Sequence, residues 1–155
     1  MKALRTIHRY WITLLFAAVV AQISAAAYGG FYAAQKLGDQ KGSDESKVVS
    51  EKTFDHGFGF HTAFGYLLFL GAVLLLVLAL AGRLGKRGIL FSLAVPVAVA
   101  VQIVLAWISG SVHAVGILHG LNALVIFGLT GYLTGHQWRA ARAATVTAPA
   151  APQMT

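Results

Sequence analysis

The sequence predicts an all-α integral membrane protein, an up-and-down bundle of four spanning helices. Hydrophobic residues make up 57% of the 155 residues and charged residues 11%, with a mean hydropathy of +0.71, so most of the chain belongs in lipid. The apolar residues fall into four runs, each long enough for a spanning helix, which needs about 20 residues. The runs are roughly Tyr10–Ala34, Phe58–Ala81, Gly88–Gly110 and Val112–Gly135, between an N-terminus (1–9) and a tail (136–155).

The distribution of charge predicts the orientation. All five acidic residues lie in the loop 36–55, where four lysines roughly balance them, and the other basic residues flank the opposite helix ends. By the positive-inside rule the loop is outside and both termini are cytoplasmic, in what we expect to be a bacterial inner membrane. The inner basic residues are Lys2, Arg5, Arg9, Arg83, Lys86, Arg87, Arg139 and Arg142.

Composition also excludes several classes of function. The net charge of +7 is explained by topology and contact with anionic lipid, so it gives no case for nucleic-acid binding. The chain has no cysteine, which excludes disulfides, iron–sulfur clusters and covalently attached haem.

The two ends of the chain have their own predictions. A basic start, an apolar stretch and the small residues Ser24–Ala27 leave a cleaved signal peptide (1–27) as an alternative to the first span, although the apolar run is longer than a signal core of 7–15 residues. The tail, with Pro149 and Pro152 among alanine and threonine, is typical of a disordered cytoplasmic segment.

Two histidines are the strongest functional signal. His61 and His119 each lie a short way inside an apolar run, and an ionisable side chain within a membrane segment is a functional candidate by default. Both lie near the outer side, deeper than His56 and His113, which mark the outer helix ends. The remaining pair, His8 and His136, lie among the inner arginines, and we expect them to be solvated.

The expected spacing of the helices favours haem. Two imidazoles on one iron need backbones roughly 12–14 Å apart, given metal–nitrogen bonds of about 2 Å, whereas packed neighbouring helices are about 8–10 Å apart. Short connections make consecutive helices antiparallel neighbours, so the second and fourth lie on a diagonal. His61 and His119 are therefore the predicted axial ligands of one haem b. The predicted surround is Gly65, Gly116, Gly120, Asn122, His56, His113, Gln22 and Gln102.

A faint internal repeat supports a twofold site. The second and fourth runs both show an outer histidine, a deeper histidine, a small residue four positions on and a phenylalanine at eight. The first and third runs each contain one mid-span glutamine, Gln22 and Gln102. The pattern is typical of a duplicated helical hairpin with an approximate twofold axis along the membrane normal.

The segment Leu118-His119-Gly120-Leu121-Asn122, together with Gln22 and the His61 helix, resembles an uncharacterised family of short bacterial four-span membrane proteins with an LHxxN motif in the last helix. The resemblance covers most of residues 8–135 and implies the same architecture. Paired histidines on helices two and four also resemble, more distantly, one half of haem A synthase and other b-type cytochromes. Haem A synthase has a carboxylate where this chain has Phe58, and typically outer-loop cysteines, so the resemblance implies haem binding rather than haem A synthesis.

These observations leave three functions open. The first is a haem-binding electron carrier or redox subunit whose partners are other membrane redox subunits or a quinone, with His56 or His113 near the propionates. The second is a non-catalytic accessory protein without a cofactor, in which His61 and His119 hydrogen-bond across helices. The third is a metal-ion or quinone site built from the four outer histidines, since imidazole suits zinc and copper.

We expect both termini in the cytoplasm and the loop 36–55 outside, because basic residues are retained on the cytoplasmic side. Alkaline phosphatase, which is active only outside, and a fluorescent protein, which folds inside, would be fused in turn to the C-terminus and to the loop. Phosphatase activity at the C-terminus would contradict this topology and reverse the predicted depth of every histidine.

Overall fold

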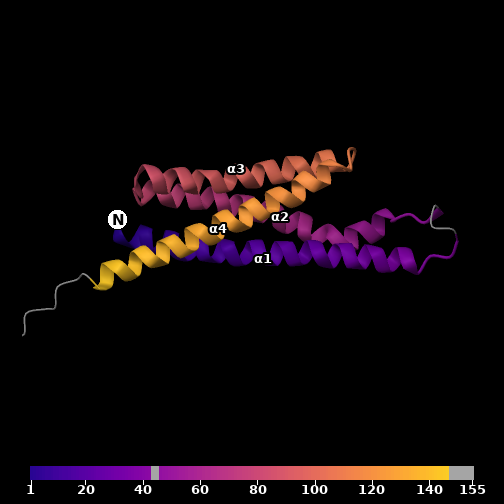
Figure 1. The fold of residues 1–155 in the computed structure, drawn as a ribbon, viewed down its shortest axis with the longest axis horizontal. Helices are drawn as coiled ribbons and strands as arrows, with labels where there is room; N and C mark the ends of the chain where they lie inside the picture. The colour runs from indigo at the N-terminus through magenta and orange to yellow at the C-terminus, as the bar shows by residue number, and fades with distance from the viewer. Residues whose placement is uncertain (43–45, 147–155) are drawn as a thin grey trace, which may run out of the picture.

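The computed structural model describes residues 1–42 and 46–146, and these form four helices. The helices are α1 (Lys2–Gly38), α2 (Glu51–Ala81), α3 (Gly85–Ser109) and α4 (Val115–Val146), shown in Figure 1. No strand occurs in the described ranges. All four helices are long and apolar enough to cross a membrane. The predicted all-α class with four membrane-length helices is confirmed.

Each helix packs against its two neighbours in the order α1, α2, α3, α4 and back to α1. Among the described residues, no pair of Cα atoms within 8 Å joins α2 to α4 or α1 to α3. The second and fourth helices therefore lie on a diagonal of the bundle, as the short connections predicted. Figure 1 shows α4 crossing from the side of α1 at its C-terminal end to the side of α3 at the opposite end.

The helices extend past the predicted apolar spans. Hydropathy detects only the part of a helix that lies in lipid, whereas backbone hydrogen bonding continues into polar sequence. Thus α1 begins at Lys2 instead of Tyr10, and α4 continues to Val146, so residues 136–146 of the predicted tail are helical. Residues 147–155 of that tail, and 43–45 of the outer loop, lie outside the described residues.

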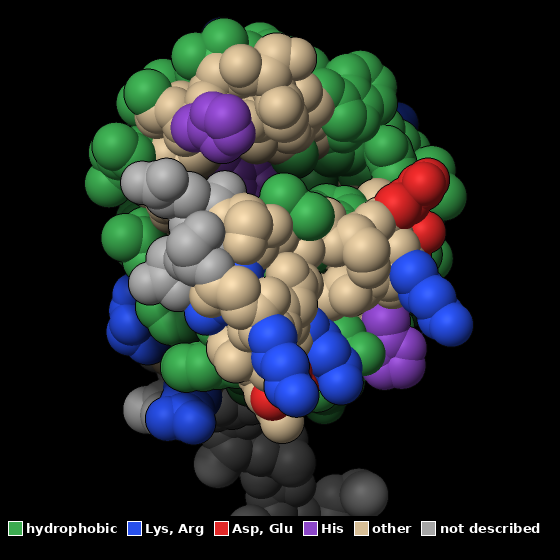
Figure 2. All heavy atoms as spheres, turned by 90° about the vertical axis from the view of Figure 1, so that its right-hand side faces the viewer, with side chains coloured by type: hydrophobic (Ala, Val, Ile, Leu, Met, Phe, Trp, Pro, Cys, Tyr) green, Lys and Arg blue, Asp and Glu red, His purple; other side chains and the backbone are tan. Residues whose placement is uncertain are grey.

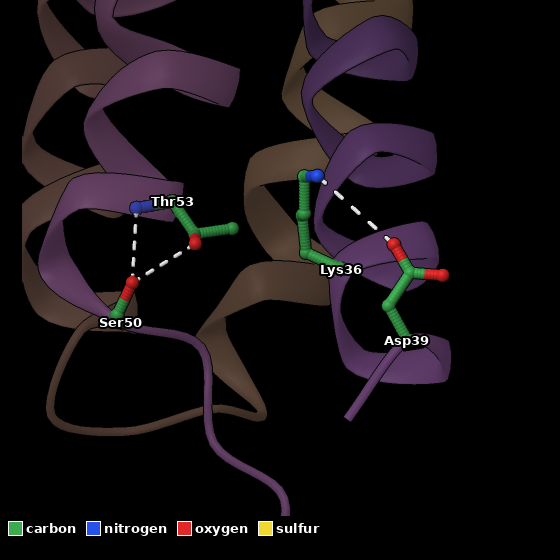
Figure 3. A network of polar contacts seen from close by, with 4 residues as sticks. All are labelled: Lys36, Asp39, Ser50 and Thr53. Carbon is green, nitrogen blue, oxygen red and sulfur yellow. Dashed lines mark hydrogen bonds and ion pairs between the residues drawn. The ribbon is translucent and has the colours of Figure 1, made fainter. Parts of the chain in front are cut away.

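Capping explains why α2 begins at Glu51, inside the predicted loop. The Ser50 hydroxyl accepts a hydrogen bond from the Thr53 backbone N–H at 3.2 Å and contacts the Thr53 hydroxyl at 2.9 Å (Figure 3). A serine in this position satisfies one of the free N–H groups of the first turn, and the negative charge of Glu51 favours the same helix end. At the other end of the loop, where α1 ends, Lys36 and Asp39 form an exposed ion pair at 4.0 Å (Figure 3).

Arg5 connects α1 to the turn after α2 at the opposite end of the bundle. Its guanidinium donates to the carbonyl oxygens of Gly82 and Arg83, both at 3.0 Å, in the tight turn after α2. The turn requires a positive φ at Gly85 (+80°) and also at Arg83 (+49°). The arginine therefore pairs with carbonyls that the end of α2 leaves free. Basic residues from two separate predicted inner segments thus meet at one end.

A packed apolar core fills the bundle between the pair His61 and His119 and the end where Arg5 contacts the turn after α2. Its buried positions repeat along the sequence, 80 residues apart between α1 and α3 and 58 apart between α2 and α4. The two hairpins therefore present equivalent faces to each other, which supports the duplicated hairpin that the sequence suggested. The buried pairs are Ile12 with Ser92, Leu15 with Val95, Val19 with Val99, Leu68 with Ile126, Ala72 with Thr130 and Leu75 with Leu133.

His8 corrects one of the predictions. We expected a solvated side chain, but His8 is 0% exposed, and its Nε2 lies 3.0 Å from the Ser92 hydroxyl across the bundle. Because α1 already begins at Lys2, His8 lies one turn before the core residue Ile12 and on the same helix face. His136 is exposed, as expected.

The contact between Gly29 of α1 and Gly57 of α2 gives a stability prediction. A Cβ added at Gly29 would lie 2.8 Å from the Gly57 carbonyl oxygen and 2.6 Å from the Phe58 ring, so Gly29→Ala must push the helices apart. We expect a cost of about 1–3 kcal/mol in the free energy of unfolding, measured by denaturation in detergent micelles.

The matched control is Gly30→Ala, because an added Cβ there meets nothing within 4 Å. Alanine favours a helix over glycine by about 1 kcal/mol at most, so this variant should unfold at the same or slightly higher denaturant concentration. Equal destabilisation by both variants would contradict the close approach of the two helices.

Candidate functional site

His61 and His119 meet across the diagonal of the bundle. Their ring centroids are 6.4 Å apart, and the ring planes are inclined by 67°. Each ring is half-buried. The pair joins α2 to α4 at a level where the backbones of these helices are too far apart for direct packing. The predicted juxtaposition of the two histidines is therefore present in the fold.

A reciprocal pair of hydrogen bonds orients each ring. The side-chain amide of Gln22 donates to the His61 backbone carbonyl at 2.7 Å, and His61 Nδ1 lies 3.1 Å from the Gln22 backbone carbonyl. A carbonyl oxygen only accepts, so His61 Nδ1 must carry the proton. In a neutral imidazole the other nitrogen, Nε2, is then an unprotonated acceptor and faces away from α1.

The second hairpin repeats this arrangement. The Gln102 amide donates to the His119 backbone carbonyl at 3.0 Å, and His119 Nδ1 lies 3.1 Å from the Gln102 backbone carbonyl. Both histidines therefore offer an unprotonated Nε2, and no hydrogen bond among the described residues involves either of these atoms. An Nδ1–H bonded to a carbonyl is the usual support for a histidine that binds metal through Nε2.

A cavity of about 540 Å³ surrounds the two histidines, and all four helices contribute to its mainly apolar wall. Eighteen of the 20 lining residues form nine pairs at equivalent positions of the two hairpins, with the spacings found in the core. Near one edge, the Trp107 indole donates to the Tyr66 hydroxyl at 3.3 Å and links α3 to α2. The repeated pairs are Val19 with Val99, Gln22 with Gln102, Ile23 with Ile103, Ala26 with Ala106, His61 with His119, Thr62 with Gly120, Gly65 with Ala123, Tyr66 with Leu124 and Leu68 with Ile126.

The environment of the site is uncharged. Viewed from the end where α1 and α2 are connected, the charged side chains gather on the α1–α2 side of that face (Figure 2). Among the described residues, no group of three or more histidine, aspartate or glutamate side chains is placed to hold a metal ion. The four outer histidines therefore do not assemble into one multi-ligand site.

The other predicted surround residues divide into two groups. Gly65 and Gly120 line the cavity, and a Cβ added at Gly120 would enter open space. Gly116, His56 and His113 do not line it. His56 instead contacts the Tyr32 ring in a tilted arrangement, with 4.7 Å between ring centroids, so it belongs to the end of the α1–α2 hairpin next to its connecting loop.

Asn122 has a role that sequence reasoning did not assign. It lies behind the cavity wall, where its amide donates to the Gln102 side-chain oxygen at 2.7 Å and to the Ala98 carbonyl at 2.9 Å. Trp107 and Tyr66 were also missed as part of the site. The interface preference of tryptophan explains Trp107 without a cavity, and only the repeat between hairpins could have indicated which residues line one.

No protein-family model, curated protein or solved structure matches this chain. The resemblance to LHxxN membrane proteins and to b-type cytochromes therefore stays a prediction. The function has to be argued from the geometry of the site.

We expect Nδ1 to carry a proton in both His61 and His119, because each Nδ1 faces a backbone carbonyl. Nitrogen-15 NMR of histidine-labelled protein in micelles at neutral pH distinguishes protonated from unprotonated ring nitrogens. The exposed His136 is the internal control, since no hydrogen bond in the described structure fixes its tautomer. An Nε2–H form of either buried ring would contradict the arrangement.

Proposed function

We propose that this chain is a membrane-embedded b-type haem protein, an electron carrier or redox subunit, in which His61 and His119 are the axial ligands of a single haem. The observation that carries the proposal is the 6.4 Å separation of the two ring centroids. Two imidazoles bonded to one metal at about 2 Å each place their centroids about 6–6.5 Å apart. The inclination of 67° is compatible, because each axial ring can rotate about its own metal–nitrogen bond.

The cavity supports haem over a bare metal ion. Its volume of about 540 Å³ lies within the roughly 300–1,000 Å³ typical of cofactor sites, whereas an ion between two histidines needs almost no space. Small residues at three lining positions, Gly65, Gly120 and Ala123, leave room beside the ligands. An apolar wall suits a porphyrin and excludes water from its iron.

The chain's own residues would hold and tune the group. Bound haem supplies one-electron chemistry, and its potential depends on the axial ligands, their hydrogen bonds and the polarity around them. The backbone carbonyls of Gln22 and Gln102 keep both imidazoles in the Nδ1–H form and increase the strength of the imidazoles as ligands. The amides of the same glutamines fix the backbones that carry the histidines.

The position of the site limits what it can do alone. The histidine pair lies on the side of the α1–α2 loop. On the other side of the described apolar core, the residue that faces His8 is Ser92, so no second pair of facing histidines is found there. One haem near one surface exchanges electrons with a neighbouring redox subunit or a quinone and does not conduct across the bilayer. We place that surface outside in a bacterial inner membrane, supported by the meeting of Arg5 with the Arg83 turn at the other end.

A cofactor-free accessory protein is the second candidate. The observation in its favour is that each histidine already has a hydrogen-bond partner on the adjacent helix, which is sufficient reason for a polar residue in a membrane bundle. In that case the histidines contribute about 0.6–2 kcal/mol of helix association and bind nothing.

We expect the protein, purified after expression with ample haem, to contain at most one b haem per chain by pyridine haemochrome assay, with a low-spin reduced-minus-oxidised spectrum. His61→Ala or His119→Ala should abolish or convert that spectrum, because each removes an axial ligand. His136→Ala, an exposed change outside the cavity, is the control. A colourless wild-type protein would favour the accessory function, and two haems per chain would contradict the single site.

A second pair of variants tests whether the haem binds in the cavity. Gly120→Leu projects a side chain into the cavity, whereas Gly116→Leu meets open space outside it. Haem content should fall at least tenfold in the first variant and stay unchanged in the second. Equal haem content in both would show that the cavity is not the binding site.

A further inference from the structure

The two half-sites are chemically unequal. In the α3–α4 hairpin, the Gln102 side-chain oxygen accepts a hydrogen bond from Asn122 at 2.7 Å. In the α1–α2 hairpin, the corresponding oxygen of Gln22 is buried and has no hydrogen-bond partner. The histidine-to-glutamine bonds are otherwise matched, so this oxygen is the point at which the two histidine–glutamine networks differ.

A single position explains the difference. Asn122 follows His119 by three residues, and the equivalent position after His61 is Phe64. Phe64 packs against the apolar core and stacks on Phe60 at 5.2 Å between ring centroids, so it offers no donor to Gln22. The missing hydrogen bond is thus a consequence of the residue type and not of a different backbone path.

This difference affects which of the two half-sites can rearrange more easily. A buried acceptor without a partner is costly, and rotation of the Gln22 amide toward a donor would break one hydrogen bond, to the His61 backbone carbonyl. Any rotation of the Gln102 amide instead breaks the bonds to Asn122 and to the His119 carbonyl. The glutamine beside His61 is therefore held by one hydrogen bond fewer than the glutamine beside His119, so rearrangement is less opposed around His61.

The packing of the helices does not prevent this rearrangement. Gly29 and Gly57 hold the backbones of α1 and α2 close together, but Gly57 lies one helical turn before His61, toward the α1–α2 loop. Withdrawal of His61 from a ligand position needs rotation of its side chain and loss of the contact between its Nδ1 and the Gln22 backbone carbonyl, with no shift of the helices. Thr62 and Gly65, next to His61 on α2, both line the cavity, so the space beside the ring is continuous with it.

We propose that His61 is the exchangeable axial ligand and His119 the permanent one, so that the haem iron also binds a small neutral diatomic molecule on the α1–α2 side. The inference rests on the proposed haem function. In the exchange, the bond between iron and His61 Nε2 breaks and a bond to the incoming molecule forms, with no change in oxidation state and no proton transferred. Carbon monoxide, which binds ferrous haem, is the probe.

The test on the loaded protein titrates dithionite-reduced protein with carbon monoxide. In the carbon monoxide complex of wild type, nitrogen-15 NMR should show His61 Nε2 released from the iron and His119 Nε2 still bound to it. Phe64→Asn, which supplies the missing donor, should weaken carbon monoxide binding at least fivefold, whereas the control Phe64→Leu should not. Failure of wild type to bind carbon monoxide, or release of His119 instead of His61, would overturn the proposal.

A measurement on haem-free protein separates this proposal from the haem proposal itself. Proton exchange at the ring Nδ1–H, followed by NMR, should be faster for His61 than for His119. Phe64→Asn should slow His61, and Asn122→Leu should accelerate His119, with neither effect depending on haem. If wild type binds no haem, the haem function fails while the unequal exchange still stands. Equal exchange rates of the two rings would refute the inequality of the half-sites.

Discussion

The reciprocal bonding of glutamine and histidine between adjacent helices is the constraint on which the site depends. In lipid, burial of apolar surface does not drive helices together, so packing and a few polar contacts decide their register. Gln22 with His61, and Gln102 with His119, each contribute two hydrogen bonds and fix one helix of a hairpin against the other. The same bonds set the tautomer of both rings. Register within each hairpin and ligand chemistry at the diagonal therefore have one origin.

Much of the architecture could be predicted because membrane helices leave simple signals. Run length gave four spans, short connections gave the diagonal of α2 and α4, and the depth of His61 and His119 indicated the pair. Helix ends were less accessible, because they depend on caps such as Ser50 and not on hydropathy. His8 shows the same weakness, since its burial follows from helical structure continuing into a charged segment.

The finer details of the site depend on side chains whose sequence signal has another explanation. Trp107 fits an interfacial anchor, Tyr66 fits any aromatic residue in a span, and Asn122 alone does not say which glutamine it meets. The difference between Phe64 and Asn122 becomes meaningful only after the two hairpins are superimposed by their repeat. The contacts between helices in the structure give the full alignment of the two hairpins, whereas the sequence pattern gives only part of it.

The repeat of core and cavity positions along one chain also has a consequence for how this site can change. A symmetric dimer of identical hairpins would carry every substitution twice, once on each side of its axis. Here the loop between α2 and α3 joins the halves, so a residue such as Phe64 changes one half-site and leaves the other unchanged. Covalent linkage thus converts a self-complementary interface into two independently adjustable surfaces that still share a single centre.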